Sequence, residues 1–237
     1  MRVAIHQPHY LPWLGYLQRM AQADLFIVLD HVQFERGNYQ NRTQVRVNGA
    51  PHWLTVPVIQ RSQKERIVDK TIDNSRDWTQ AHYETLRRAY TSARYFSAYG
   101  ARLKRVYERR WERLVDLNAA MLELLRDAFA ISTPLTRSSK LCDQGAKSEL
   151  VLNLCKAVGA RTLIVGLGGS RAYLDRAAFA EAGIALEMQQ FRHPVYPQRV
   201  PAPFSAGLSA VDLLFNCGHD SRGLLLGHTA RECRIAA

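Results

Sequence analysis

The chain runs RVAIHQPHYLPWLGYLQRMAQADLFIVLD from Arg2 to Asp30. Residues 2–5 are apolar enough for a buried strand, and residues 24–30 repeat such a run and end in an acid. Between the two runs, Pro12 suits the first turn of a helix, where its missing N–H costs nothing. A strand, a helix and a second strand in this order predict the opening of a parallel α/β sheet.

Beyond this unit, the pattern changes at about residue 40 and returns to α/β alternation at residue 147. Residues 42–48 and 52–58 alternate around Asn48-Gly49, which is typical of a β-hairpin. Further elements are expected as a strand at 67–72, helices over 76–130 divided at Gly100, helices at 147–158 and 172–182, and strands at 162–166 and 184–188. The sequence therefore predicts one α/β domain over residues 1–237. Its Rossmann-like parallel sheet would carry a β-hairpin and a helical subdomain inserted at about residues 40–130.

The composition excludes several classes of protein. Hydrophobic residues make up 47% of the chain, which is enough for a core and argues against disorder. No apolar run is long enough to span a membrane and the N-terminus lacks the pattern of an export signal, so a cytoplasmic location is expected. The four cysteines form no CxxC pair and are expected to be free thiols. The cysteines are Cys142, Cys155, Cys217 and Cys233.

The charge of the chain is strongly positive. A net charge of +11 favours a polyanionic partner or a phosphorylated substrate, although a basic surface kept for solubility would give the same value. Arg102, Arg105, Arg109 and Arg113 are spaced for one helical face. That face could bind a tRNA backbone or be an ordinary solvated surface.

The loop from His6 to Tyr16 follows the first expected strand, and ligands of open α/β sheets bind at the carboxyl ends of strands. It is dense in imidazole, phenol and amide groups, although its aromatic residues could equally belong to the core. His6 and His9 have the spacing HxxH, but a metal would need a third ligand and a helix, so no metal is expected. The candidate residues in this loop are His6, Gln7, His9, Tyr10, Trp13 and Tyr16.

Other candidates follow later strands. Asp30 ends the second strand and is expected to orient the imidazole of His6 as a general base. The glycine-rich turn at 168–170 could approach a phosphate, or it could be an ordinary tight turn. The remaining candidates are Gln33, Gln40, Asn41 and Arg42 for sugar hydroxyls or phosphates, Gly168, Gly169 and Ser170 for phosphate, and His193 and Tyr196 for the opposite side of the substrate. We expect His6, Asp30, Ser170 and His193 to line one common pocket.

Seven stretches resemble the WbqC-like protein family, in order, over nearly the whole chain. They are HQPHYLPWLGY at 6–16, VLDHVQ at 28–33, QNR at 40–42, WLTVP at 53–57, GGSRAYLD at 168–175, HPVYP at 193–197 and DLLFN at 212–216. The glycine-rich stretch adds Tyr173 to the expected substrate-binding residues. At position 9 the resemblance implies a smaller polar residue such as Asn, and this chain has His9.

The resemblance implies a bacterial enzyme of O-antigen or related sugar biosynthesis that places an aminoacyl group, glycyl being one candidate, or an acyl group on a sugar amine. His6 with Asp30 would be the base, and Gln7, Asn41 or helix N–H groups would bind the oxyanion. The activated donor would be an aminoacyl-tRNA, a carrier thioester or an ATP-derived adenylate. No further cofactor is expected.

Two alternatives stay open at this stage. An ATP-dependent amide ligase or nucleotidyltransferase-like enzyme is one, because the opening unit also resembles nucleotidyltransferases that carry HxGH, where this chain has Trp13-Leu-Gly-Tyr16. A non-catalytic module that binds sugar nucleotides or RNA is the other.

Overall fold

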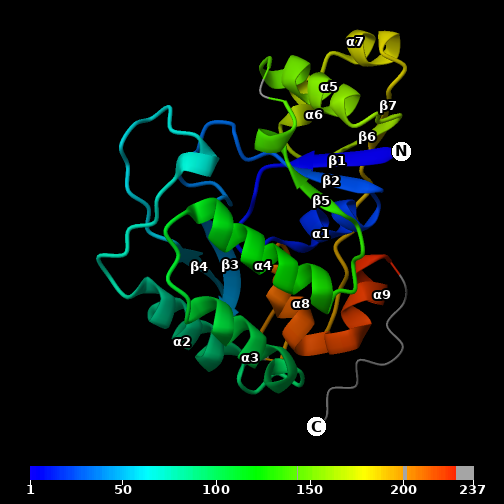
Figure 1. The fold of residues 1–237 in the computed structure, drawn as a ribbon. Coiled ribbons are helices and arrows are strands. Elements are labelled where there is room, and N and C mark those ends of the chain that lie inside the picture. The colour runs from blue at the N-terminus through cyan, green and yellow to red at the C-terminus, as the bar shows by residue number, and fades with distance from the viewer. Residues whose placement is uncertain (143, 200–201, 228–237) are drawn as a thin grey trace.

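The computed structural model describes residues 1–142, 144–199 and 202–227 (Figure 1). Its main sheet has five strands in the order β5-β2-β1-β6-β7, and every neighbouring pair is parallel. The strands are β1 (Arg2–His6), β2 (Leu25–Val28), β5 (Leu135–Arg137), β6 (Thr162–Val165) and β7 (Ala185–Met188). The predicted Rossmann-like α/β class is confirmed.

Helices cover both faces of this sheet, because successive residues of each strand point to opposite sides. Val3 and Ile27 belong to the core on the side of α5 (Lys147–Ala157) and α7 (Arg176–Glu181). Ala4 and Phe26 belong to the larger core, which is shared with α1 (Leu14–Ala21), α4 (Leu114–Ala128) and α8 (Ala210–Cys217). Figure 1 shows these two groups of helices on either side of the strands.

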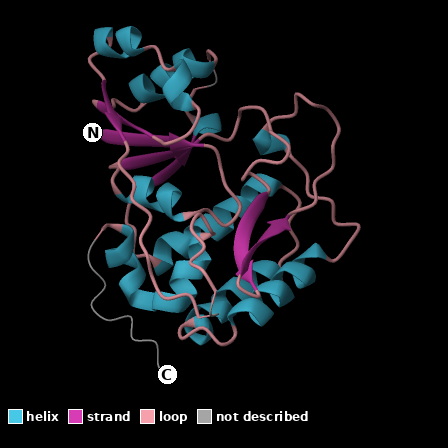
Figure 2. Ribbon diagram, turned by 180° about the vertical axis from the view of Figure 1, so that it is seen from behind, coloured by secondary structure: helices cyan, strands magenta, loops and turns pink. Residues whose placement is uncertain are grey.

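The segment between β2 and β5 forms the predicted β-hairpin and a set of helices. The hairpin strands are β3 (Arg42–Val47) and β4 (Ala50–Thr55), and Figure 2 shows them apart from the main sheet. Asn48 and Gly49 both have positive φ, 50° and 83°, as the tight turn between such strands requires. The helices of this segment are α2 (Trp78–Tyr90), α3 (Phe96–Tyr107) and α4.

Several boundaries differ from the prediction. Gly100 lies inside α3 rather than at a break, and its missing Cβ lets the ring of Phe96 pack closely against the helix. Residues 67–69 form a 3-10 turn, η1 (Ile67–Asp69), instead of a strand. The helix expected at 172–182 is two helices, α6 (Ser170–Tyr173) and α7, because Asp175 caps α7 by accepting hydrogen bonds from the N–H groups of residues 177 and 178.

The arginine stripe does not share one helical face, so that prediction is wrong. Helix α3 ends at Tyr107, and Arg109 and Arg113 therefore lie beyond it. Arg102 pairs with Asp127 at 3.2 Å, while Arg113 donates to the carbonyl oxygen of Asp69. The guanidiniums of Arg102 and Arg113 thus already bind groups of the protein, which leaves them less available to a polyanion such as tRNA.

The remaining elements are short. They are η2 (Ser138–Lys140), η3 (Gly218–Asp220) and α9 (Ser221–Leu225). Cys142 and Cys155 have free thiols, as predicted, and Cys233 lies outside the described residues. In the described parts of the chain, no helix is long and apolar enough to cross a bilayer.

Candidate functional site

The carboxyl ends of all five parallel strands lie at one edge of the sheet. His6 at the end of β1 pairs in register with Val28 at the end of β2, and Ala4 pairs with Ile164 of β6. The His6 loop and the glycine-rich turn after β6 therefore start from the same edge, although they come from opposite halves of the chain. Ligands of open parallel sheets bind at this edge.

His6 has a defined tautomer. Its Nδ1 lies 3.0 Å from the backbone carbonyl oxygen of Gln7. Because a carbonyl oxygen only accepts, Nδ1 carries the hydrogen and Nε2 of the neutral ring keeps its lone pair. In the part of the chain that the structure describes, no hydrogen bond occupies Nε2. The half-buried ring packs edge-on against His9, at 4.5 Å between centroids, and beside Tyr16, at 4.8 Å. His6 is thus oriented as a proton acceptor.

Asp30 does not pair with His6, so that part of the prediction is wrong. Its fully buried carboxylate accepts hydrogen bonds from the Ser138 hydroxyl at 3.1 Å and from the N–H and hydroxyl of Ser139 at 3.0 and 2.9 Å. The reason is β5, a three-residue strand that the sequence did not predict, which brings both serines beside the end of β2. Asp30 therefore links the end of β2 to the end of β5. The backbone carbonyl of Gln7, and not Asp30, orients the ring of His6.

Gln7 and Gln40 connect the His6 loop to the loop after β2. Nε2 of Gln40 donates to Oε1 of Gln7 at 2.9 Å, and Oε1 of Gln40 accepts from the N–H of Glu35. The carbonyl oxygen of Gln40 accepts from Asn118 of α4. This fixes Oε1 of Gln7 and leaves its Nε2 without a hydrogen bond among the described residues. Asn41 donates to the carbonyl oxygen of Val56, which is a structural contact.

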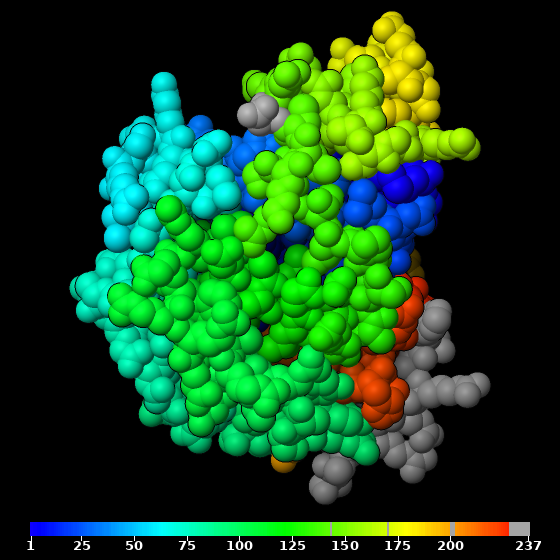
Figure 3. Space-filling view, in the orientation of Figure 1, coloured from blue at the N-terminus to red at the C-terminus, as the bar shows by residue number. Residues whose placement is uncertain are grey.

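A cavity of about 310 Å³ opens beside this loop, beneath α4. In Figure 3 it is the hollow between α4 and the segment after β5, with N-terminal atoms at its floor. Its lining residues are Pro8, His9, Val28, Val115, Asn118, Ala119, Leu122, Glu123, Leu135, Thr136, Arg137 and Lys140. Of the four residues expected to share a pocket, none lines this cavity, while His9 does.

His9 lies in this cavity wall as a neutral base. The side chain is 6% exposed, and burial lowers its pKa to about 3. Its Nδ1 and the Oδ1 of Asn118, both buried, have no hydrogen-bond partner among the residues described. Two polar atoms left unpaired in the residues of one cavity are typical of a place that a ligand fills.

The low pKa of His9 makes stability depend on pH. In the unfolded chain the pKa of this imidazole returns to about 6.5. Between about pH 6.5 and pH 3, the unfolded chain therefore binds a proton at His9 and the folded chain does not. We expect unfolding free energy to fall by about 2 kcal/mol through His9 alone between pH 7 and pH 5. Urea unfolding of wild type and His9→Asn at both pH values measures this. An equal loss in the variant would contradict the assignment.

Tyr10 is not available to a substrate. Its ring is fully buried, and its hydroxyl binds Nδ1 of His82 at 2.9 Å and the hydroxyl of Tyr107. The chain turns inward at Leu11, which has a φ of 42°, and this carries Tyr10 toward α2 and α3. Burial raises its pKa well above the usual value of 10. Tyr10 thus anchors the inserted helices, and its expected substrate contact is wrong.

Tyr16 and Trp13 stay beside the site. Burial also raises the pKa of Tyr16, so its hydroxyl, which has no hydrogen-bond partner in the described chain, keeps its proton. Trp13 is half-buried, packs edge-on against Phe191 and lies so close to Gly15 that any larger residue there would overlap it.

Two aromatic residues that the sequence analysis did not assign to the site lie beside it, Tyr39 before the hairpin and Trp53 in β4. Tyr39 lies between His9, at 5.5 Å, and Trp53, at 5.7 Å, and the guanidinium of Arg42 stacks over Trp53 at 4.2 Å. The stretch WLTVP at 53–57 could have indicated this role, because a tryptophan on the exposed face of a strand does not contribute to the core. Gln33 points elsewhere and donates to the carbonyl oxygen of Gln63.

The glycine-rich turn is open to solvent. A Cβ at Gly168 or Gly169 would meet nothing within 4 Å, so neither glycine serves a close internal contact. Ser170 begins α6, and the expected role of its side chain lies outside what the structure describes. Tyr173 is 43% exposed, and its pKa is raised by partial burial and then by the charge of Glu35. Helix α6 therefore approaches the loop that follows β2.

His193 and Tyr196 belong to a different polar group. His193 donates from Nδ1 to the carbonyl oxygen of Pro194 and accepts at Nε2 from the N–H of Gly207, so both ring nitrogens are occupied. Tyr196 donates to Asp212 at 2.8 Å. The buried carboxylate of Asp212 on α8 draws this loop inward, and the expectation that His193 and Tyr196 face the substrate is wrong.

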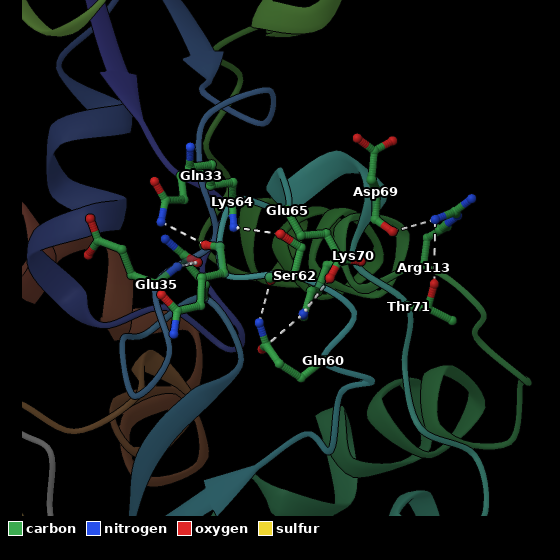
Figure 4. Close-up of polar contacts among 12 residues, drawn as sticks. Gln33, Glu35, Gln60, Ser62, Lys64, Glu65, Asp69, Lys70, Thr71 and Arg113 are labelled. Atoms are coloured by element: carbon green, nitrogen blue, oxygen red, sulfur yellow. Dashed lines mark hydrogen bonds and ion pairs between the residues drawn. The ribbon is translucent and has the colours of Figure 1, made fainter.

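A buried ion pair between Lys70 and Glu65 was also missed. Figure 4 shows Lys70 reaching Glu65, at 2.8 Å, and Gln60, at 3.3 Å. The Lys70 side chain is fully buried and its Nζ lies 4.8 Å from the centre of the Phe34 ring. An ion pair within the loop of residues 58–72 leaves no periodic pattern in the sequence by which it could be predicted. The Lys70–Glu65 pair stabilises this loop beside the loop that carries Gln33.

The described residues contain no group of three or more histidine, cysteine, aspartate or glutamate side chains arranged to hold a metal ion.

Comparison with known proteins places the chain. The model of the WbqC-like protein family matches residues 7–223. The uncharacterized protein Rv1507c of Mycobacterium tuberculosis is 29% identical over 234 residues, which cover 98% of this chain and 99% of that protein. No solved structure matches significantly. Because the family model spans nearly the whole sequence, the chain belongs to the WbqC-like protein family.

Proposed function

We propose that the protein is a transferase that places an acyl or aminoacyl group, glycyl being one candidate, on the amine of a sugar or sugar nucleotide in polysaccharide or natural-product biosynthesis. The tautomer of His6 is the observation that carries this proposal. With Nδ1 engaged by the carbonyl oxygen of Gln7, Nε2 offers a lone pair at the edge of the sheet where ligands bind. Amine attack on a carbonyl needs such a base.

The residues supply each part of the transfer. The amine nitrogen attacks the donor carbonyl carbon, a C–N bond forms, and Nε2 of His6 takes the amine proton. The free Nε2–H groups of Gln7, whose Oε1 is held by Gln40, stabilise the oxyanion. Collapse of the intermediate breaks the bond to the leaving group, a thiolate or the hydroxyl of a tRNA end, which receives the proton from His6.

The test offers one acceptor and three donors. Purified protein is incubated with a nucleotide-linked amino sugar and either glycyl-tRNA, an acyl thioester, or glycine with ATP, and the amide product is measured by mass spectrometry. We expect product from one of the first two donors without nucleotide cleavage. Release of AMP or pyrophosphate in the third reaction would support an ATP-dependent ligase instead. Binding of the sugar nucleotide without turnover by any donor would support a non-catalytic module.

A further inference from the structure

Arg19 is a buried cation without a partner in the described chain. It lies in α1 with 5% of its surface exposed, its Nε is buried without a hydrogen-bond partner, and among the described residues no carboxylate pairs with its guanidinium. Its pKa is lowered to about 10 by burial. Buried arginines are almost always paired, because an isolated charge out of water is costly. An arginine left unpaired in this way points to an anion that is absent from the protein itself.

The position of the guanidinium follows from the direction of helical side chains. They lean toward the helix N-terminus, and the N-terminus of α1 faces the carboxyl edge of the sheet, where its preceding strand ends. The guanidinium of Arg19 is therefore carried back to Gly166, the first residue after β6. A Cβ at position 166 would overlap Nη1 of Arg19, so glycine is needed there for space.

A second guanidinium touches the same residue. Arg171 of α6 donates from Nε to the carbonyl oxygen of Gly166 at 2.9 Å and from Nη2 to that of Gln189 at 3.1 Å. In the described chain, neither arginine contacts a carboxylate. Two positive charges at one glycine, next to the open turn at Gly168 and Gly169, suit a dianion better than a single carboxylate.

We propose that Arg19 and Arg171 form a binding site for a phosphate group of a small-molecule ligand at the end of β6. Arg171 is oriented by two carbonyl oxygens, and Arg19 is packed against Gly166, so both are preorganised for the anion. The site does not depend on which group is transferred at His6, and it would exist in a protein with no transferase activity.

The first test measures binding of pyrophosphate and of UDP by calorimetry at constant ionic strength. We expect Arg19→Met to weaken both affinities by about 10–100-fold, because charge-assisted hydrogen bonds are lost. Arg161→Met is the matched control, since Arg161 is exposed and precedes the same strand at its amino end. It should bind both probes as wild type does. Equal affinities in Arg19→Met and wild type would overturn the proposal.

A second measurement separates binding from folding. In chloride alone, Arg19→Met should have a Tm equal to or above that of wild type, because an uncompensated buried charge has gone. Pyrophosphate should raise the Tm of wild type and of Arg161→Met but not that of Arg19→Met. A wild-type rise that sodium chloride of equal ionic strength reproduces would overturn the site. Tighter binding of acetate, a carboxylate probe, than of pyrophosphate would overturn its assignment to phosphate.

Discussion

Replacement of His6 with alanine is expected to lower kcat/KM for amide formation by about 10²–10⁴-fold, the usual contribution of a general base. The lone pair on Nε2 would be lost, and neither of the two other histidines predicted for the site can replace it. Both nitrogens of His193 are engaged, and burial holds the pKa of His9 at about 3, too low for an efficient base at neutral pH. Steady-state kinetics with the donor identified by the screen measures the effect.

The control for this prediction is His219→Ala. His219 lies in η3, where it pairs with Asp220 at 3.2 Å, and its side chain is largely exposed. That variant should keep wild-type kinetics. Added imidazole should restore part of the activity of His6→Ala if the missing group is a base. A His6→Ala protein that is folded and fully active would remove His6 from the mechanism.

The largest expected effect on stability comes from Asp212. Its carboxylate is fully buried and accepts hydrogen bonds from the hydroxyls of Tyr90 and Tyr196, both at 2.8 Å, and from Gln198 at 2.9 Å. Alanine would leave the two buried tyrosine hydroxyls and the half-buried amide of Gln198 without their acceptor, and it would remove the negative charge near Arg46. We expect Asp212→Ala to lower the free energy of unfolding by about 3–5 kcal/mol, measured by urea denaturation.

Asp212→Asn separates charge from hydrogen bonding. Burial raises the pKa of Asp212 above its usual value, so the folded protein holds this proton more tightly than the unfolded chain does. This group therefore makes folding less favourable as the pH rises from about 4 through its folded pKa. The asparagine variant would lack that pH dependence and lose less stability than the alanine variant at pH 7. An unfolding midpoint for Asp212→Ala equal to that of wild type would refute the role of the network.

The sheet could be predicted from the sequence because its strands are continuous apolar runs, as in β1 and β2. Strand β5 could not, since Leu135–Arg137 is three residues long and half-polar. Because β5 was not predicted, the partner of Asp30 was also predicted wrongly. Without β5, nothing in the sequence places Ser138 and Ser139 beside Asp30, and the carboxylate is assigned to His6, which ends the other strand expected to open onto the same edge.

The candidate site was predictable where chain order fixes position. His6 and Gln7 follow a strand, and a parallel sheet determines which edge they reach. The sequence does not reveal in which direction a side chain points from a loop at this edge of the sheet. Tyr10 points into the inserted helices and His193 toward Gly207, in both cases because a distant polar group offers a hydrogen bond. The role of Arg19 could not be predicted either, because nothing in the sequence of its helix indicates that its guanidinium packs against Gly166.

The central place of β1 has a consequence for synthesis of the chain. Its two neighbours in the sheet are β2, which begins at Leu25, and β6, which begins at Thr162. During translation, one edge of β1 must therefore wait for more than half of the protein to be made before its partner exists. Parallel sheets closed by such distant pairings form late and leave apolar strand edges exposed meanwhile. The inserted hairpin and helices emerge in that interval and can fold locally first.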